Sequence, residues 1–153
     1  MAIVRCEHGD VFAFAYDATT GERGLQCKML NKTGGATVKG NLVSLSTATD
    51  KGVILQTNTY DTIGVIDEAG VADGSEAWVW MLGSVCQVLY KDSTAATRGN
   101  ILIADAVDGR ASDIANPGGG LPGADTHFQE CGHVMESKNA GTDVLVLAIL
   151  HFN

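Results

Sequence analysis

A weak internal duplication constrains this chain more than any other feature of its sequence. The segment Gly40-Asn-Leu-Val-Ser-Leu45 is matched by Gly99-Asn-Ile-Leu-Ile-Ala104, and Thr62-Ile-Gly-Val-Ile66 is matched by Glu130-Cys-Gly-His-Val134. A polar turn with glycine follows in each copy, and then an apolar segment, 77–82 in the first and 144–149 in the second. Because these segments recur in the same order, we expect two related units at about 39–85 and 98–150.

The spacing between the copies changes once along the chain. It is 59 residues at the first glycine (40 to 99) and 68 residues at the second (64 to 132). The second copy supplies the extra length with the Gly- and Pro-rich tract 116–124, which we interpret as a loop because helices and sheets do not tolerate that density of Gly and Pro.

Each unit has the pattern of short strands joined by tight turns. Runs of four to eight Val, Ile, Leu and Trp residues are bounded by Gly, Asp and Asn, and Asp108-Gly109 is a strong hairpin signal. No window carries a sustained helical apolar stripe with a cap at both ends. The sequence therefore predicts an all-β fold, a compact β-barrel or β-sandwich built from the two weakly similar units, with residues 37–153 as one β domain.

The first 36 residues lie outside the predicted duplication. Val11-Phe-Ala-Phe-Ala-Tyr16 alternates aromatic residues with alanine, so Phe12, Phe14 and Tyr16 share one face of an extended strand, with Val11 before them. This segment is either an extra strand on the same body or an extended N-terminal arm that adds to a neighbouring protein's sheet. Residues 17–37 have the composition of an irregular connection. A second aromatic pair, Trp78 and Trp80, shares one face of a predicted strand and is expected in a core or an interface.

Composition excludes two classes of partner. The net charge is −8, and no cluster of three Lys or Arg residues exists, so we expect no binding to nucleic acid. The first ten residues carry charges where a signal peptide needs an apolar core, and the longest apolar run, 144–150, is far shorter than a membrane span. We therefore expect that the protein is made in a cytoplasm and does not associate with a membrane.

Four short segments resemble a family of small phage head proteins. They are Gly40-Asn-Leu-Val-Ser-Leu45, Gly52-Val-Ile-Leu55, Thr62-Ile-Gly-Val-Ile66 and Arg98-Gly-Asn-Ile-Leu-Ile103. In size and in this repeated pattern, the chain is similar to the capsid cement or decoration proteins of tailed phages, which are encoded beside the major capsid protein. The similarity covers roughly residues 39–150.

The resemblance implies a viral structural protein with no enzymatic activity. Members of this family are mostly β, are typically homotrimers, and bind the outer surface of the head, where they stabilise it by bridging capsid subunits. The expected partners are therefore the major capsid protein and further copies of this chain, and the expected location is the virion exterior. The expected interface residues are Val11, Phe12, Phe14, Tyr16, Trp78 and Trp80. The alternative function is a carbohydrate- or host-surface-binding β module of a head fibre or tail, with Trp78 and Trp80 stacking on sugar rings.

Two constellations of reactive side chains have simpler interpretations. Cys6-Glu-His8 and Cys131-Gly-His133 offer four zinc ligands, but paired zinc ligands usually have two to four residues between them, whereas each of these pairs has one. We interpret the pairs as buried thiols beside polar histidines. Asp125, His127, Glu130 and His133 crowd one stretch, yet no Gly-x-Ser-x-Gly elbow accompanies them. We therefore expect no catalytic residue, no cofactor and no metal.

Overall fold

The structure, a computed structural model, describes residues 3–8, 12–57, 61–115 and 129–151. The described residues form twelve strands in one continuous hydrogen-bonded sheet, so the predicted all-β fold class is confirmed. Within those ranges, no helix has the length and apolar character needed to cross a membrane. In chain order the strands are β1 (Val4–His8), β2 (Phe12–Tyr16), β3 (Arg23–Asn31), β4 (Leu42–Leu45), β5 (Gly52–Leu55), β6 (Gly64–Ile66), β7 (Glu76–Met81), β8 (Val85–Leu89), β9 (Ile101–Ala104), β10 (Ala111–Ile114), β11 (Glu130–Val134) and β12 (Leu145–Leu150).

Strands β3 to β7 form a first unit whose hydrogen-bonded pairs make a closed circuit. β3 pairs with β5 in parallel, and β5–β4, β4–β6 and β6–β7 are antiparallel pairs. β7 then returns to pair with β3 in antiparallel orientation, from Gln26 opposite Trp80 to Leu30 opposite Glu76. Closing the circuit removes exposed strand edges from this unit.

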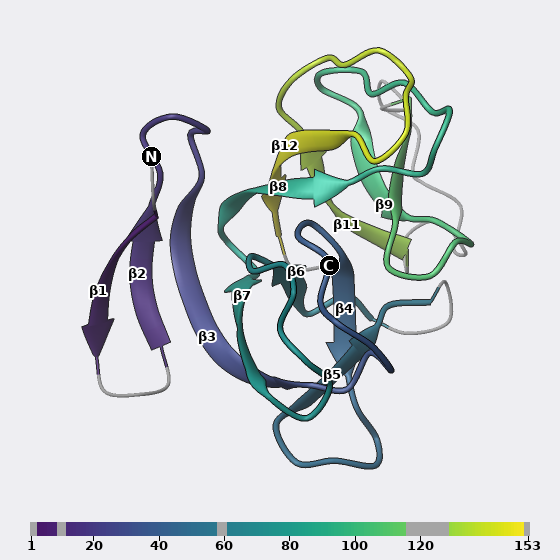
Figure 1. Cartoon of the computed structure of the whole chain (residues 1–153). Helices are drawn as coiled ribbons and strands as arrows, with labels where there is room; N and C mark the ends of the chain where they lie inside the picture. Colours follow the sequence, from purple (N-terminus) through teal and green to yellow (C-terminus); the bar gives the residue numbers. More distant parts are fainter. Residues whose placement is uncertain (1–2, 9–11, 58–60, 116–128, 152–153) are drawn as a thin grey trace.

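Strands β8 to β12 form a second unit that repeats this pairing. β10–β9, β9–β11, β11–β12 and β12–β8 are antiparallel pairs. A parallel bridge between Tyr90 and Ala111 stands where β3 and β5 pair in the first unit. Figure 1 shows the two units one above the other, with the second unit, in green and yellow, uppermost.

Individual backbone hydrogen bonds match between the two units. The Gly40 amide donates to Ile66 O at 2.8 Å, and the Gly99 amide donates to Val134 O at 2.9 Å. Four further backbone hydrogen bonds of the first unit have a counterpart in the second. Ile66 N to Asn41 O matches Val134 N to Asn100 O, and Asp67 N to Trp78 O matches Met135 N to Leu147 O. Asn31 N to Ser75 O matches Tyr90 N to Val144 O, and Lys32 N to Val53 O matches Lys91 N to Ala111 O. The repeat is therefore a repeat of backbone geometry.

The structure gives the repeat wider bounds than the sequence analysis did. Residues 17–37, expected to be an irregular connection, contain β3, and this strand is the counterpart of β8 because Cys27 opposite Val79 matches Cys86 opposite Ala148. The sequence prediction was wrong here because β3 contains polar residues such as Gln26 and Lys28, which do not give the apolar pattern of a strand. The strand nevertheless pairs with β2, β5, β7 and β8. The last strands are also offset by 69 residues, since Gly64 faces Met81 and Gly132 faces Leu150.

The two units share one hydrophobic core. A small cluster in the first unit contains Met29, Val43, Val53, Ile66 and Val79. The five equivalent residues of the second unit are Val88, Leu102, Ala111, Val134 and Ala148, and these belong to a larger cluster that also takes in Leu42, Val65 and Trp80 from the first unit. Because the larger cluster crosses from one unit to the other, the units pack as a single body.

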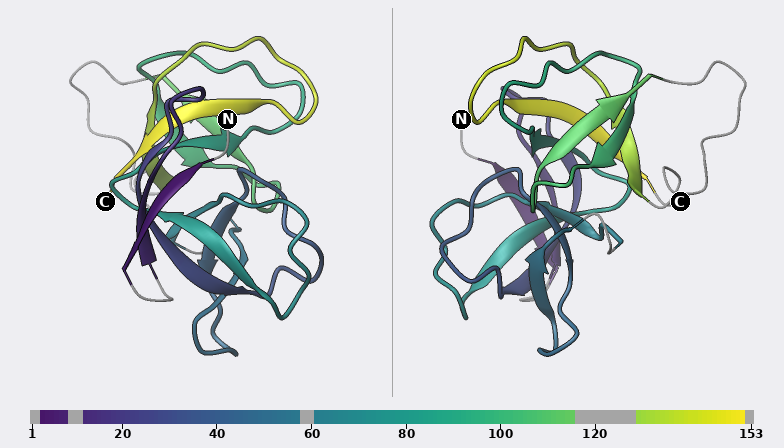
Figure 2. Two further views of the ribbon diagram at one scale, coloured as in Figure 1. Left: turned by 60° about the vertical axis from the view of Figure 1, so that its left-hand side comes forward. Right: turned by 90° about the vertical axis from the view of Figure 1, so that its right-hand side faces the viewer.

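The N-terminal segment forms a hairpin on the first unit. β1 pairs with β2 along its whole length, and β2 pairs with the beginning of β3. Figure 1 shows this hairpin at one side of the molecule, with β1 outermost, and the left view of Figure 2 brings it to the front. Among the described residues, β1 pairs with no strand other than β2, so it is an edge strand of the sheet.

Candidate functional site

The outer face of β2, in the N-terminal hairpin, is aromatic and exposed. Phe12, Phe14 and Tyr16 keep 45%, 60% and 51% of their surface accessible. They alternate with Ala13 and Ala15, which are buried, so the strand turns its aromatic residues outward and its small residues inward. This is the reverse of the usual amphipathic strand, in which large apolar residues face the core.

Cross-strand neighbours extend this apolar face on both sides of β2. Val4 of β1 lies opposite Tyr16, and Leu25 of β3 lies opposite Phe14. Both are exposed, at 41% and 36%. We call the set Val4, Phe12, Phe14, Tyr16 and Leu25 the hairpin face. Exposed apolar patches often mark interaction sites, so the hairpin face is the candidate interaction surface.

A buried ionic network fastens the other side of the hairpin to the body. Arg5 Nη2 of β1 lies 2.6 Å from Asp67 Oδ2, and Arg5 Nε donates to Gln26 Oε1 at 2.7 Å. Gln26 Nε2 also donates to Asp67 Oδ2, at 2.8 Å. Asp67 and Gln26 are almost completely buried, so these charge-assisted bonds operate in a low dielectric and hold β1 in a defined position.

Lys39 joins two buried carboxylates within the same network. Its Nζ donates to Glu22 Oε2 at 3.0 Å and to Asp67 Oδ1 at 3.2 Å. Burial lowers the pKa of Lys39, but the hydrogen bonds and charges of Glu22 and Asp67 outweigh this effect and raise that pKa above its ordinary value. Two cations, Arg5 and Lys39, thus balance two buried anions, which is the condition for keeping such charges inside a protein.

The two tryptophans of the predicted interface lie inside the protein. Trp80 is fully buried and its Nε1 donates to Asp67 Oδ1 at 3.2 Å. Trp78 is 6% exposed, and its ring is covered by the Arg5 guanidinium and the Lys28 ammonium, each 5.1 Å from the ring centroid. Neither residue offers surface to a partner, so the interface prediction needs correction at these two positions. One face of β7 is covered by the cluster that joins the two units and by the two cations, and the other face, with Val79, packs on the small cluster of its own unit.

Of the remaining predicted interface residues, three lie together and one cannot be placed. Phe12, Phe14 and Tyr16 share the hairpin face, whereas Val11 lies outside the described residues. The sequence analysis missed Val4 and Leu25, whose places depend on which strands pair with β2. It also missed the network of Arg5, Glu22, Gln26, Lys39 and Asp67, whose members come from separate parts of the chain.

Cys131 and His133 do not form a joint metal site. Cys131 is buried in the core and its thiol donates to Leu102 O at 3.6 Å. Burial raises the pKa of the Cys131 thiol to about 12, so the thiolate that a metal would need is disfavoured. The side chains of Cys6 and His8, and residues Asp125 and His127, lie outside what the structure describes.

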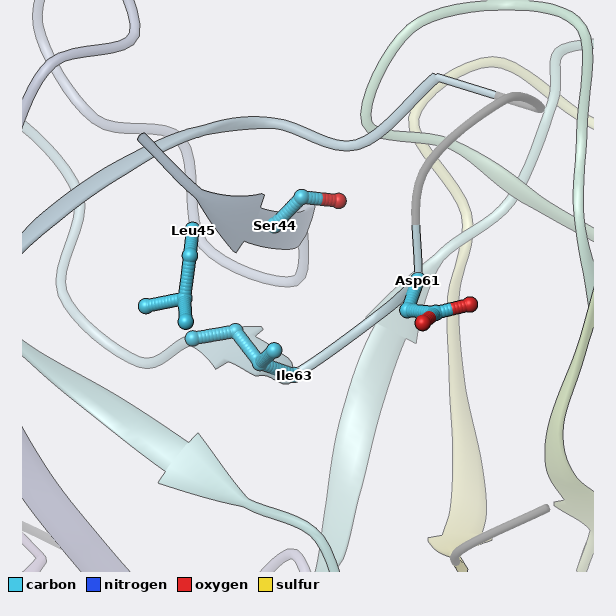
Figure 3. Close-up of a pocket in the computed structure, with 4 residues that line it drawn as sticks. All are labelled: Ser44, Leu45, Asp61 and Ile63. Atoms are coloured by element: carbon cyan, nitrogen blue, oxygen red, sulfur yellow. The ribbon is translucent and has the colours of Figure 1, made fainter. Parts of the chain in front are cut away.

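A shallow pocket of about 220 Å³ lies on the first unit, away from the hairpin face. Ser44, Leu45, Asp61 and Ile63 line it, and Figure 3 shows the Leu45 and Ile63 side chains meeting on one side of it. Among the described residues, the lining offers the Asp61 carboxylate and the Ser44 hydroxyl. General acid–base chemistry needs at least a base positioned against a second reactive group, so this pocket supports no assignment.

Comparison with protein-family models gives no match for this chain, and comparison with curated proteins gives none either. The geometry of the hairpin face therefore has to carry the functional argument.

Proposed function

We propose that this chain is a non-enzymatic structural protein of a tailed-phage virion, a cement or decoration protein that binds the capsid exterior through its hairpin face. The observation that carries the proposal is the outward-facing aromatic strand β2, held rigid from behind by the Arg5–Asp67 network. A protein whose task is adhesion needs apolar surface presented on a stiff support, and it needs no reactive cleft.

The hairpin offers two means of attachment. Its apolar face can be buried against a partner, and a standard stable interface buries roughly 800 Å² on each side. In addition, the free edge of β1 can pair backbone to backbone with a strand of a neighbouring protein. Both means work by shape and contact, in keeping with a protein that bridges capsid subunits.

The choice of a capsid as partner rests on the sequence resemblance and on charge. The net charge of −8 suits the outside of a shell, away from the packaged genome. A homotrimer would present three hairpin faces at once, and the second and third contacts would then form at high effective concentration. The trimer and the virion location are parts of the proposal.

The structure does not have the exposed tryptophans on which the alternative of a carbohydrate-binding module depended. That alternative needs Trp78 and Trp80 exposed for stacking on sugar rings, whereas both are buried. No specific observation now favours it over adhesion to a shell.

The test is binding to capsid shells that lack the protein. Purified chain is mixed with such shells of its own phage, and cosedimentation is measured against concentration; we expect saturable, stoichiometric binding. The double variant Phe14→Ser/Tyr16→Ser should bind at least about tenfold more weakly, since exposed aromatic residues are typical interface hot spots. Its melting temperature should stay close to that of the unmodified chain because both side chains are exposed.

Leu45→Ser is the matched control. Leu45 is 54% exposed but lies on the first unit outside the hairpin face, so its loss should leave shell binding unchanged. If the unmodified chain binds no cognate shell, the proposed function is wrong. If it binds and the double variant binds equally well, another surface makes the contact.

A further inference from the structure

Three metal-ligating side chains meet on the outer face of the second unit. They are Glu130 and His133 of β11 and His151, which follows β12, and one ligand atom from each lies within 4.8 Å of the others. Glu130 Oε1 is 3.2 Å from His151 Nε2, and the two imidazole rings have centroids 5.0 Å apart. All three residues are partly buried.

A bulge in β11 brings Glu130 and His133 to the same face. In a regular strand, residues three apart point to opposite faces. Here the register against β9 shifts between Glu130 and Gly132, since Glu130 faces Ile103 and Gly132 faces Leu102. Such a shift changes which face the flanking side chains occupy, and bulges are enriched beside functional sites. Pairing of β11 with β12 then brings His151 alongside, and its amide donates to Cys131 O at 3.3 Å.

The fold itself does not require these residue types. The equivalent positions of the first unit, found from the pairing of Gly64 with Met81 and of Gly132 with Leu150, are Thr62, Val65 and Leu82. Val65 is fully buried in the cluster that joins the two units, whereas His133, at the matching place in the second unit, is only partly buried. Exposure explains why a polar residue is tolerated there. It does not explain why two histidines and a glutamate converge.

We propose that Glu130, His133 and His151 bind a divalent transition-metal ion, with zinc as the best fit. Imidazole nitrogen and carboxylate oxygen are the ligands that zinc accepts beside thiolate, at about 2.0–2.2 Å, which places neighbouring ligand atoms roughly 3.4 Å apart in a tetrahedral site. The Glu130–His151 distance already meets that requirement. Rotation of the partly exposed side chains brings the third ligand in, and water fills the fourth position.

A bound metal ion would link His151, which follows β12, to strand β11. His151 directly follows Leu150, the last residue of β12, and strand ends open more readily than strand centres. A metal that binds the folded state and not the unfolded chain raises stability by mass action. This inference is independent of the proposed capsid role.

The test uses the full chain, purified without a histidine tag and treated with a chelator. Titration with zinc chloride in a calorimeter should show saturation at one ion per chain, and saturating zinc should raise the melting temperature by several degrees. His133→Gln and His151→Gln should each weaken zinc binding about 100-fold or more, beyond the losses typical of outer-shell changes. Glu76→Gln, an exposed carboxylate outside the cluster, should bind zinc as the unmodified chain does.

The absorption spectrum of bound Co²⁺ distinguishes this site from adventitious metal binding by cysteine. A Co²⁺ complex with nitrogen and oxygen ligands shows visible d–d bands without the near-ultraviolet charge-transfer band of thiolate ligation, and we expect the former. The histidine variants should keep the metal-free melting temperature, which shows that they fold. Absence of saturable binding, a thiolate band, or zinc affinity unchanged in both histidine variants would overturn the proposal.

Discussion

At the scale of single residues, two glycines show why the same short motif recurs in both units. A Cβ added to Gly64 would lie 2.3 Å from Trp80 O, and one added to Gly132 would lie 2.1 Å from Ile149 O. Real Cβ atoms do not come so close to a backbone oxygen. Strand β6 in the first unit and β11 in the second therefore approach the last strand of their unit, β7 or β12, at a distance that only glycine permits.

Alanine at either position should destabilise the protein. We expect Gly64→Ala and Gly132→Ala each to lower the free energy of unfolding by roughly 2–3 kcal/mol, because the added methyl group must push two paired strands apart. Urea unfolding followed by tryptophan fluorescence measures the change. Gly35→Ala is the control, since a Cβ there would meet nothing within 4 Å. Equal losses at Gly35 and Gly64 would contradict the close-approach explanation.

At the scale of elements, the N-terminal hairpin is attached to the body by the pairing of β2 with β3 and by the Arg5 side chain of β1. Arg5 reaches from β1 to Asp67, which is 62 residues away in sequence. This polar contact and the buried Ala13 and Ala15 hold the inner side of the hairpin, and the larger aromatic residues of β2 point outward. Large apolar residues at a sheet edge usually face the core, whereas here the aromatic residues of β2 stay accessible to a partner.

Replacing Arg5 should loosen the hairpin and leave the rest of the sheet intact. We expect Arg5→Ala to cost about 2 kcal/mol, less than a fully buried pair, because its side chain keeps 21% exposure and Asp67 retains Lys39. Amide hydrogen exchange should accelerate in β1 and β2 but not in β9. Lys32→Ala removes an exposed pair with Asp73 at 3.7 Å and should change neither. Faster exchange throughout the sheet would show that the network serves the core instead.

At the scale of the whole molecule, the shared core contains ionisable groups that must stay neutral. Cys86 and Cys131 are both buried in the cluster that joins the two units. Burial raises the pKa of Cys131 from the ordinary 9.0 to about 12 and raises that of Cys86 well above its ordinary value. The folded protein therefore holds thiol protons at pH values where the unfolded chain has released them.

Stability should consequently fall as the pH rises above about 9. When the unfolded state binds fewer protons than the folded state, the free energy of unfolding decreases with pH, here by roughly 1.4 kcal/mol per pH unit for each buried thiol. The effect should begin near the ordinary thiol value and, for Cys131, continue to about 12. Urea unfolding at about pH 8 and about pH 10 measures it. Cys131→Ala should show a shallower dependence, and an identical slope would refute the assignment.

The sequence by itself determined the type of fold and the strands that local pattern can define. Alternation in Phe12–Tyr16 correctly predicted that the three aromatic residues share a face, and the turn at Asp108-Gly109 lies between β9 and β10. The repeated glycines at 64 and 132 were visible too, because a close approach imposes the same residue each time it occurs. These features depend on neighbours a few residues apart, which a sequence pattern contains.

Only the tertiary structure decided what each apolar or polar segment contacts. β3 was missed because its polar residues are satisfied by partners such as Asp67, which is 41 residues from Gln26. Trp78 and Trp80 have the same spacing as Phe12 and Phe14, yet one pair is buried and the other exposed. A second unit and a pair of cations cover β7, whereas Phe12 and Phe14 keep 45% and 60% of their surface accessible. Glu130, His133 and His151 meet only through a bulge and a strand pairing. Burial and ligand convergence are properties of long-range pairing, and a linear pattern does not specify them.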